Sequence, residues 1–452
     1  MMRRRGLLTA GGAASLAALS TGLGTLWGDG SRAAAGGDYR ALVVLFLNGG
    51  NDGHNLLVPT DGAYGDYQTA RANLALPKNS LLTLPGTSIG HSFGVHPSLA
   101  AMHPMYGQQR LVFIANVGPL VMPATATQVL ANAVEVPPFL MSHNDQINTQ
   151  QGWSLAEESS GWAGRGLEAL PSTLRHALSA VTLGNGRMLV QGRRNAPAFL
   201  ARGGSRQWGD ADLAQPQSSD AQNLRALAQQ QYPNAYQAEY ARTMAAAIDD
   251  STRFTQALMQ GSAPTADFGG GELGERLREL ATILPVMKAQ GLRRQVYLLE
   301  WGGLDTHSDQ RGSSAWSQDS QLAEMAKALA AFDQSNRASG LDLDVLTLAT
   351  SDFGRTMRPG SGGGSEHAWG NHWFAMGGAV EGGKVQGIFP SPVLGGPDDG
   401  DALKNGRHVP TTSTDQVAAT LMQWLGLPPS QFHEVFPWLV NFQQKTIPLL
   451  RS

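Results

Sequence analysis

The chain of 452 residues contains no cysteine. Disulfide bonds, thiolate metal ligands and cysteine nucleophiles are therefore excluded. After the first residues, the sequence has neither an apolar run as long as a membrane span nor a block of lysine and arginine. We consequently expect no permanent membrane span and no nucleic-acid partner.

The first 35 residues have the composition of an export signal. The adjacent Arg4 and Arg5 precede a weakly apolar stretch of alanine, glycine and leucine, and Ala33 to Ala35 supply an A-x-A type cleavage site. Paired arginines are typical of twin-arginine export, which predicts a periplasmic or secreted protein. A retained membrane span is the alternative, although the apolar part is short and interrupted by glycine. Removing residues 1–35 removes four arginines and one aspartate, so the formal charge changes from −3 to −6.

Continuous apolar runs that end in turn-forming residues recur along the rest of the chain. Strands buried on both faces of a parallel sheet have this pattern. The predicted strands are 41–47, 111–118, 181–190, 295–303, 343–352 and 372–380, and the predicted helices are 97–107, 271–289, 321–334 and 413–425. Their alternation predicts an α/β fold, a three-layer sandwich with a largely parallel central sheet and helices on both faces.

Residues 193–270 do not follow this alternation. They are rich in alanine, glutamine and arginine and carry one long amphipathic pattern from Asp220 to about Met259. The pattern predicts a helical insertion within a single domain that spans residues 36–452. The insertion either packs on the core or forms a lid over a binding site, and the sequence leaves both open.

The segment from Ser351 to His372 gathers metal-ligand side chains behind a predicted strand. The strand delivers Asp352 into a glycine-rich loop, which then presents Glu366, His367 and His372. Carboxylate oxygens and imidazole nitrogens are ligands of hard and borderline divalent metals. In open parallel sheets, ligand sites lie at the carboxyl ends of the strands. The segment therefore predicts one edge of a metal site.

Two other predicted strands end in comparable groups. Asp305 and His307 follow 295–303, and residues two apart in an extended segment face the same way. Asp52 follows 41–47 among asparagines and glycines, where a structural role in a turn is the alternative. Because the carboxyl ends of parallel strands converge, we expect these groups to share one metal site with those of the segment from Ser351 to His372. The expected ligands are Asp52, Asp305, His307, Asp352, His367 and His372.

Ser142 is the candidate nucleophile. It follows Pro137 and Pro138 and can cap a helix whose backbone N–H groups favour an anion, and a metal ion would activate its hydroxyl. A plain N-cap is the alternative, and His143 is a second candidate for acid–base chemistry. The sequence has no G-x-S-x-G motif, no P-loop and no G-x-G-x-x-G motif after a strand, so nucleophile-elbow hydrolases and nucleotide-binding proteins are not supported.

The order and spacing of these motifs resemble the alkaline phosphatase and sulfatase superfamily, and more closely a secreted branch of it, the domain-of-unknown-function family 1501. The similarity covers nearly the whole mature chain. It is carried by FLNGGNDGHNLLVP, HPSLAAMHPMYGQQRLVFIANVG, SHNDQ, GWAGR, WGGLDTHSDQ, SDFGRT and EHAWGNH. The resemblance implies one or two divalent metal ions (Zn, Mn, Mg or Ca), with ligands among Asp52, Asp305, His307, Asp352 and His367. It also places Ser142 near the nucleophile position and implies that Arg165 helps to hold an anionic ester substrate.

Phe353 departs from the superfamily pattern, which has a histidine beside the aspartate that resembles Asp352. Either His372 or His54 replaces this ligand, or the site holds one ion, or catalysis has been lost. We expect an exported metal-dependent hydrolase of phosphate or sulfate esters. The alternatives are a catalytically degenerate member that binds a cell-surface glycan, lipid or protein, and a structural component assembled with another exported protein.

Overall fold

The structure is a computed structural model that describes residues 38–152, 159–204, 207–208, 211–212 and 218–451. The predicted signal peptide, residues 1–35, lies outside the described residues. Among the helices in the described ranges, none is both long enough and apolar enough to cross a membrane.

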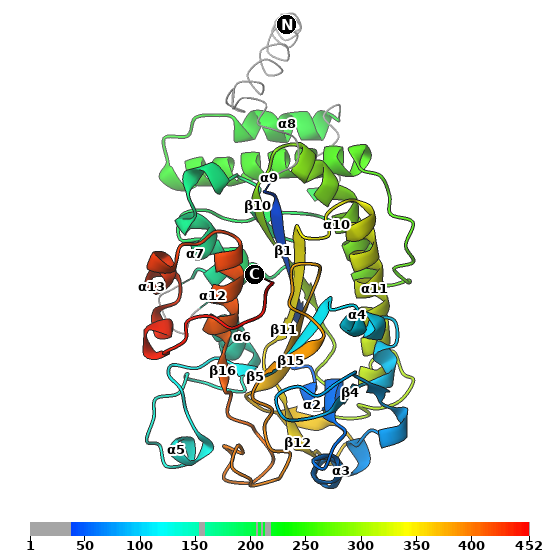
Figure 1. Cartoon of the computed structure of the whole chain (residues 1–452). Helices are drawn as coiled ribbons and strands as arrows, with labels where there is room; N and C mark the ends of the chain where they lie inside the picture. Colours follow the sequence, from blue (N-terminus) through cyan, green and yellow to red (C-terminus); the bar gives the residue numbers. More distant parts are fainter. Residues whose placement is uncertain (1–37, 153–158, 205–206, 209–210, 213–217, 452) are drawn as a thin grey trace, which may run out of the picture. The chain divides into compact units, whose positions relative to one another are not determined.

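A nine-stranded sheet forms the centre of the domain (Figure 1). Its strand order is β15 (Lys384–Gly387), β5 (Leu111–Gly118), β14 (Asn371–Met376), β11 (Val345–Ser351), β1 (Arg40–Leu47), β10 (Arg294–Trp301), β6 (Ala180–Thr182) and β7 (Ala198–Phe199), with β16 (Thr412–Ser413) beside β5. The pairings in this sheet are parallel except for the two that β14 makes, with β11 and β5. The predicted α/β class with a largely parallel central sheet is confirmed.

Helices cover both faces of the sheet because alternate residues of the central strands point to opposite sides. On one face, Val43 and Leu45 of β1 share a core with residues of α4 (His103–Gly107), α10 (Glu272–Ala289) and α11 (Gln318–Ala338). On the other face, Val44 and Phe46 share a core with residues of α7 (Trp162–Ala169), α12 (Thr414–Trp424) and α13 (Phe432–Val435). The uninterrupted apolar run of β1 is therefore a consequence of burial on both sides.

The carboxyl ends of β1, β10 and β11 lie side by side. Leu47 is in register with Trp301 of β10 and with Ser351 of β11. The chain leaves β1 towards α2 (Gly53–Leu56), β10 towards a loop that leads to α11, and β11 towards the paired strands β12 (Arg355–Pro359) and β13 (Ser365–His367). Helix α6 (His143–Gln151) begins at the same edge, where His143 contacts Asp352. The segments that carry the predicted ligands therefore meet.

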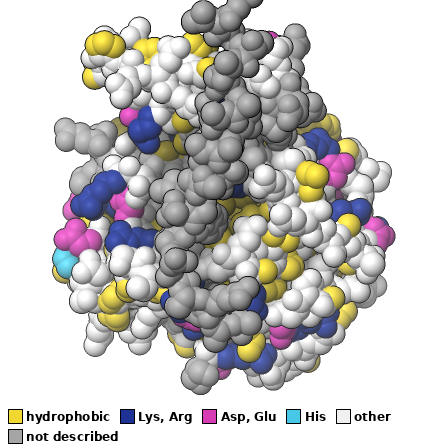
Figure 2. All heavy atoms as spheres, turned by 90° about the horizontal axis from the view of Figure 1, so that it is seen from above, with side chains coloured by type: hydrophobic (Ala, Val, Ile, Leu, Met, Phe, Trp, Pro, Cys, Tyr) yellow, Lys and Arg dark blue, Asp and Glu magenta, His cyan; other side chains and the backbone are white. Residues whose placement is uncertain are grey.

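The insertion contains two helices, α8 (Ser219–Ala228) and α9 (Ala235–Gln260), instead of the single predicted one. Pro233 cannot continue a helix, and the Asn234 side chain accepts the first N–H groups of α9. Helix α9 packs on the core through Phe254 and Ala257. Both helices lie at the end of the sheet opposite α2 and β12, a position that favours packing over a lid (Figure 1). Seen from that end, charged side chains of both signs lie among hydrophobic ones (Figure 2).

Two other sequence predictions were wrong in extent. The strand predicted at 181–190 ends at Thr182, where its hydroxyl bonds to the backbone of Gly184 and Gly186. The helix predicted at 97–107 is interrupted, so α4 begins only at His103. The remaining elements are β2 (Leu57–Pro59), α3 (Tyr64–Arg71), β3 (Leu82–Thr83), β4 (Phe93–Val95), α5 (Ala126–Leu130), β8 (Gln207–Trp208) and β9 (Ala211–Asp212).

Candidate metal centre

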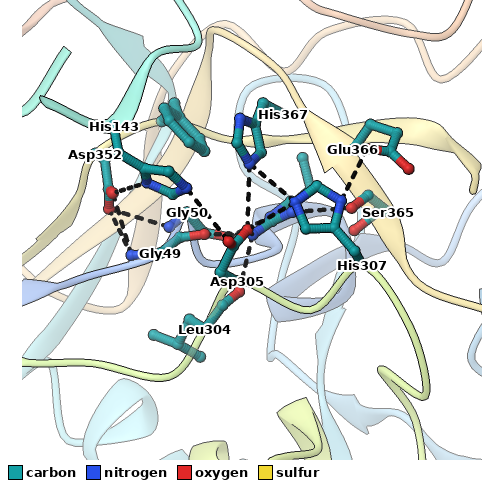
Figure 3. Close-up of polar contacts among 12 residues, drawn as sticks. Gly49, Gly50, His143, Leu304, Asp305, His307, Asp352, Ser365, Glu366 and His367 are labelled. Carbon is teal, nitrogen blue, oxygen red and sulfur yellow. Dashed lines mark hydrogen bonds and ion pairs between the residues drawn. The ribbon is translucent and has the colours of Figure 1, made fainter. Parts of the chain in front are cut away.

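Three histidines and one aspartate meet at the carboxyl edge of the sheet (Figure 3). The ligand atoms of His143, Asp305 and His367 all lie within 4.8 Å of one another. His307 Nε2 joins them, 3.0 Å from Asp305 Oδ1 and 3.0 Å from His367 Nε2. The side chains of these four residues are 24% to 44% exposed, so solvent and a small substrate can reach them.

In each of the three imidazoles, Nδ1 is held by an oxygen acceptor. The acceptors are Asp352 Oδ2 for His143 at 2.7 Å, Glu366 Oε2 for His307 at 2.8 Å, and the Met141 carbonyl for His367 at 2.9 Å. With a divalent ion in the centre, each Nδ1 would donate to its oxygen acceptor, which would leave the lone pair of Nε2 for the ion. Metal-ligating histidines are oriented by the same kind of contact.

The three Nε2 atoms converge on the carboxylate of Asp305. Its Oδ2 lies 3.4 Å from His143 Nε2, and its Oδ1 lies 3.2 Å from His367 Nε2. His143 Nε2 is buried and has no hydrogen-bond partner. Metal–nitrogen bonds of roughly 2.0–2.1 Å in a tetrahedral site place the ligand atoms about 3.3 Å apart. The distances from Asp305 to the three Nε2 atoms, and from His307 Nε2 to His367 Nε2, are close to this value, so the group has the spacing of ligands to a divalent ion.

The side chain of Arg355 holds the Asp305 carboxylate in place. Its fully buried guanidinium forms an ion pair with Asp305 Oδ1. It also donates to four backbone carbonyls, those of Gly49, Gly50, Leu304 and Ser365. Burial alone would raise the pKa of Asp305, but the hydrogen bond and the charge of Arg355 bring it down to about 2. Asp305 is thus a permanent carboxylate at neutral pH.

Asp352, predicted as a ligand, lies behind His143 with its oxygens turned to other donors. They accept the backbone N–H groups of Gly49 and Gly50 and face His143 Nδ1. The hydrogen bond to Asp352 raises the pKa of His143, since the carboxylate stabilises the charged ring. Asp352 therefore orients a ligand and is not aimed at the centre itself.

Asp52 lies apart from the four converging groups. Its buried carboxylate forms an ion pair with Arg71 and accepts from Gln310 Nε2 and from the backbone N–H of His54, which makes it the N-cap of α2. Each oxygen is already engaged. The structural role in a turn, weighed as the alternative, is the one that these contacts describe.

His372 also lies elsewhere, in a buried cluster with His54 and His408. The ring centroid of His54 is 5.7 Å from that of His372 and 5.1 Å from that of His408. His372 Nδ1 accepts the backbone N–H of Asn116 at 3.1 Å, so the ring proton is on Nε2 and no lone pair remains there. His372 and His54 therefore lie in a separate cluster and not with His143, Asp305, His307 and His367.

Ser142 and Arg165 were predicted to attack and to bind the anion. Ser142 is the N-cap residue of α6, but its hydroxyl donates to Asp145 Oδ2 at 2.6 Å and accepts no helix N–H. Arg165 is buried and donates to the backbone carbonyls of Gly152, Ser160 and Val435. Its guanidinium therefore ties α7 to α13 and to the backbone at Gly152 and Ser160.

The sequence reasoning missed Arg355 and the role of Glu366. Arg355 follows Asp352 by three residues, but nothing in the segment SDFGRT separates a buried arginine from an exposed one. The sequence analysis counted Glu366 among the metal-ligand side chains of its segment, but in the structure its carboxylate faces His307 Nδ1. The available signal that Glu366 lies near the metal centre was its position directly before His367 in the sequence.

The fold and this edge of the sheet define an α/β protein with a solvent-accessible candidate metal centre of three histidines and one aspartate. The chain belongs to the DUF1501 family, described as "Protein of unknown function (DUF1501)", which matches residues 39–432. No curated protein matches the chain.

Several solved structures have a distant likeness to the chain. The lipoteichoic acid synthase LtaP from Listeria monocytogenes is 9% identical, with 86% of this chain and 72% of that chain covered and a TM-score of 0.33. A protein in the alkaline phosphatase superfamily from Vibrio parahaemolyticus is 9% identical, with 86% and 67% covered and a TM-score of 0.35. The phosphonate monoester hydrolase from Silicibacter pomeroyi is 10% identical, with 86% and 73% covered and a TM-score of 0.32. Likeness at this level assigns no activity to the chain.

Proposed function

We propose that the chain is a metal-dependent hydrolase of phosphate or sulfate esters. The observation that carries this proposal is the convergence of three imidazole Nε2 atoms on one carboxylate at a solvent-accessible strand edge. Each imidazole is oriented by a hydrogen-bond acceptor behind it, which is the arrangement expected of ligands. A purely structural cluster would not require lone pairs to face one another.

His143, Asp305, His307 and His367 would hold the ion. Three nitrogens and one oxygen favour Zn or Mn over Mg and Ca, which prefer oxygen ligands throughout. When bound, such an ion supplies a Lewis acid that neutralises the ester oxygens and favours deprotonation of a hydroxyl. Asp352 and Glu366 keep His143 and His307 in the tautomer that leaves Nε2 available.

Ser142 stays the proposed nucleophile. It directly precedes His143, and its hydroxyl donates to Asp145 Oδ2 at 2.6 Å. The Asp145 carboxylate is therefore placed to take the proton when Ser142 Oγ attacks the phosphorus or sulfur atom. The bond to the ester oxygen breaks, the alcohol leaves with that proton, and water then releases phosphate or sulfate from Ser142. A Ser142→Ala variant should lose at least about 100-fold in kcat and keep its metal. Unchanged kcat would assign the attack to water.

We also propose that residues 1–35 direct export through the twin-arginine route. The proposal rests on the Arg4–Arg5 pair and the alanines before Gly36. Replacing both arginines with lysine should prevent cleavage and keep the protein in the cytoplasm. Cleavage that continues in this variant would refute the route.

Hydrolysis of aryl phosphate and aryl sulfate esters by the metal-loaded protein tests the activity. Turnover should depend on the added metal and should fall below about 1% in Asp305→Asn. His433→Ala is the matched control, because His433 is exposed and contacts only Glu434 among the ion pairs of the described residues. A metal-bound protein without turnover on either ester class would favour the catalytically degenerate binding or assembly protein. The structural argument for that alternative is Phe353, whose ring contacts those of His143 and His367.

A further inference from the structure

Asp352 has no oxygen available for a second ion. Oδ1 accepts from Gly49 N at 2.9 Å and from Gly50 N at 3.0 Å, while Oδ2 accepts from Gly49 N at 3.1 Å and faces His143 Nδ1 at 2.7 Å. These four contacts come from three donors, since the N–H of Gly49 is shared by both oxygens, and together they engage Oδ1 and Oδ2. The side chain is 1% exposed. An ion bound here would have to displace bonds that hold the loop after β1 and orient His143.

Phe353 fills the space beside Asp352. Its fully buried ring lies 4.7 Å from the His143 ring and 4.5 Å from the His367 ring, measured between centroids. A Cβ atom added to Gly50 would lie 2.5 Å from Phe353 Cε2, so the ring is packed directly against the loop. Hydrocarbon therefore occupies the inner side of the histidine cluster, where a second ion would need oxygen or nitrogen ligands.

Arg355 supplies a fixed positive charge on the inner side of Asp305. Its contacts run from Nε to Gly50 O at 2.8 Å, from Nη1 to Ser365 O at 2.9 Å, and from Nη2 to Leu304 O, Gly49 O and Asp305 Oδ1. Because the guanidinium is buried, water does not screen its charge effectively. A second divalent ion that shared Asp305 from this side would be repelled by the guanidinium.

We propose that the centre binds a single divalent ion and that Arg355 is the permanent second positive charge at this site. The inference rests on the proposed function, which supplies the ion, but it concerns residues of this chain that lie behind the ion. Arg355 does not reach the substrate, because its donors end on backbone carbonyls and Asp305. It is a positioning residue that ties the loops after β1 and β10 to β13.

Metal stoichiometry tests this inference without any activity assay. The wild-type protein is stripped with a chelator, reloaded with Zn²⁺ or Mn²⁺, desalted and measured by elemental analysis and titration calorimetry. We expect one ion per chain. Phe353→His adds a nitrogen ligand beside Asp352, yet it should still bind one ion because Arg355 remains. Only Phe353→His combined with Arg355→Met should accept a second ion.

Two ions per wild-type chain, or two in Phe353→His, would overturn the inference. No ion in the wild type would overturn both the inference and the proposed hydrolase. One ion without turnover of any ester would refute the hydrolase and leave the single-ion assignment standing. If the double variant does not fold, as judged by circular dichroism, the wild type and Phe353→His still decide the question.

Discussion

Among the residues that the structure describes there are two groups of three histidines, and one of them has the geometry of a metal site. His143, His307 and His367 are partly exposed and surround Asp305, with each Nδ1 held by an acceptor. The second group consists of His54, His372 and His408, which are 7%, 3% and 1% exposed. His372 Nδ1 accepts a backbone N–H, and neither nitrogen of His408 makes a hydrogen bond of normal geometry.

The contrast shows that the number of histidines does not define a metal site. Whether a histidine can act as a ligand depends on the hydrogen-bond partner of its other ring nitrogen. An acceptor at that nitrogen holds the proton there and leaves the lone pair of the first nitrogen for the ion. The first group also has a carboxylate whose negative charge a divalent ion can neutralise. The second group lies among buried neighbours and adds no charge, so we assign it a packing role.

The largest effect is expected from removing ligands of the first group. His367→Ala or Asp305→Asn should weaken Zn²⁺ binding by roughly 100-fold or more, since each removes a direct ligand. His372→Leu and His408→Leu, in the second group, should bind Zn²⁺ as the wild type does. Competition with a chromophoric chelator measures all four. Equal loss in both groups would contradict the assignment.

A smaller effect is expected from Asp352→Asn. An asparagine has one acceptor oxygen where the carboxylate has two, so it cannot satisfy Gly49, Gly50 and His143 together. His143 should lose its fixed tautomer, and Zn²⁺ affinity should fall by roughly 10- to 100-fold. Calorimetric titration measures the change. Wild-type affinity in this variant would show that Asp352 does not orient His143.

The second group should instead control acid stability. Burial lowers the pKa of His372 to about 3 and that of His408 to about 4. Both are neutral in the folded chain, whereas the unfolded chain takes up protons below about pH 6.5. The contribution of these neutral histidines to the free energy of unfolding is therefore complete above that pH. As the pH falls, it is lost at roughly 1.4 kcal/mol per pH unit for each histidine. Urea unfolding between pH 7 and 4.5 measures this slope. The double variant His372→Leu and His408→Leu should reduce the slope, with the buried His54 still contributing to it, and an unchanged slope would contradict the argument.

The smallest effect is expected from Glu366→Gln. Glu366 faces His307 Nδ1 at 2.8 Å, but its side chain is 50% exposed, and water can replace the carboxylate as an acceptor. Zn²⁺ affinity should fall by no more than about tenfold. A loss as large as that of Asp352→Asn would mean that His307 depends on Glu366 as strongly as His143 depends on Asp352.

The central strands could be predicted from the sequence because their burial on both faces leaves an unbroken apolar run. Val43, Val44, Leu45 and Phe46 are such a run, and β5 spans the predicted residues 111–118. The short strand β6 could not be delimited, because the hydroxyl of Thr182 bonds to the loop that follows. Pro233 was the available signal for the break between α8 and α9.

That the segments after β1, β10 and β11 lie at one edge could be inferred from the strand ends, which parallel neighbours bring together. The direction of each side chain did not follow. Asp52 pairs with Arg71 of α3, a partner that no local pattern indicates. His372 lies on β14, the strand that runs against its neighbours, and its ring meets the backbone of β5 instead of the centre. The directions of the Asp52 and His372 side chains are set by tertiary contacts, which sequence spacing does not reveal.

Anomalous diffraction at the zinc absorption edge, from crystals of the Zn²⁺-loaded protein, tests the central claim most directly. We predict one anomalous peak, from a zinc ion bonded to His143 Nε2, His307 Nε2, His367 Nε2 and Asp305. A peak between His54, His372 and His408, or a loaded crystal without a peak at Asp305, would contradict the assignment of the metal centre.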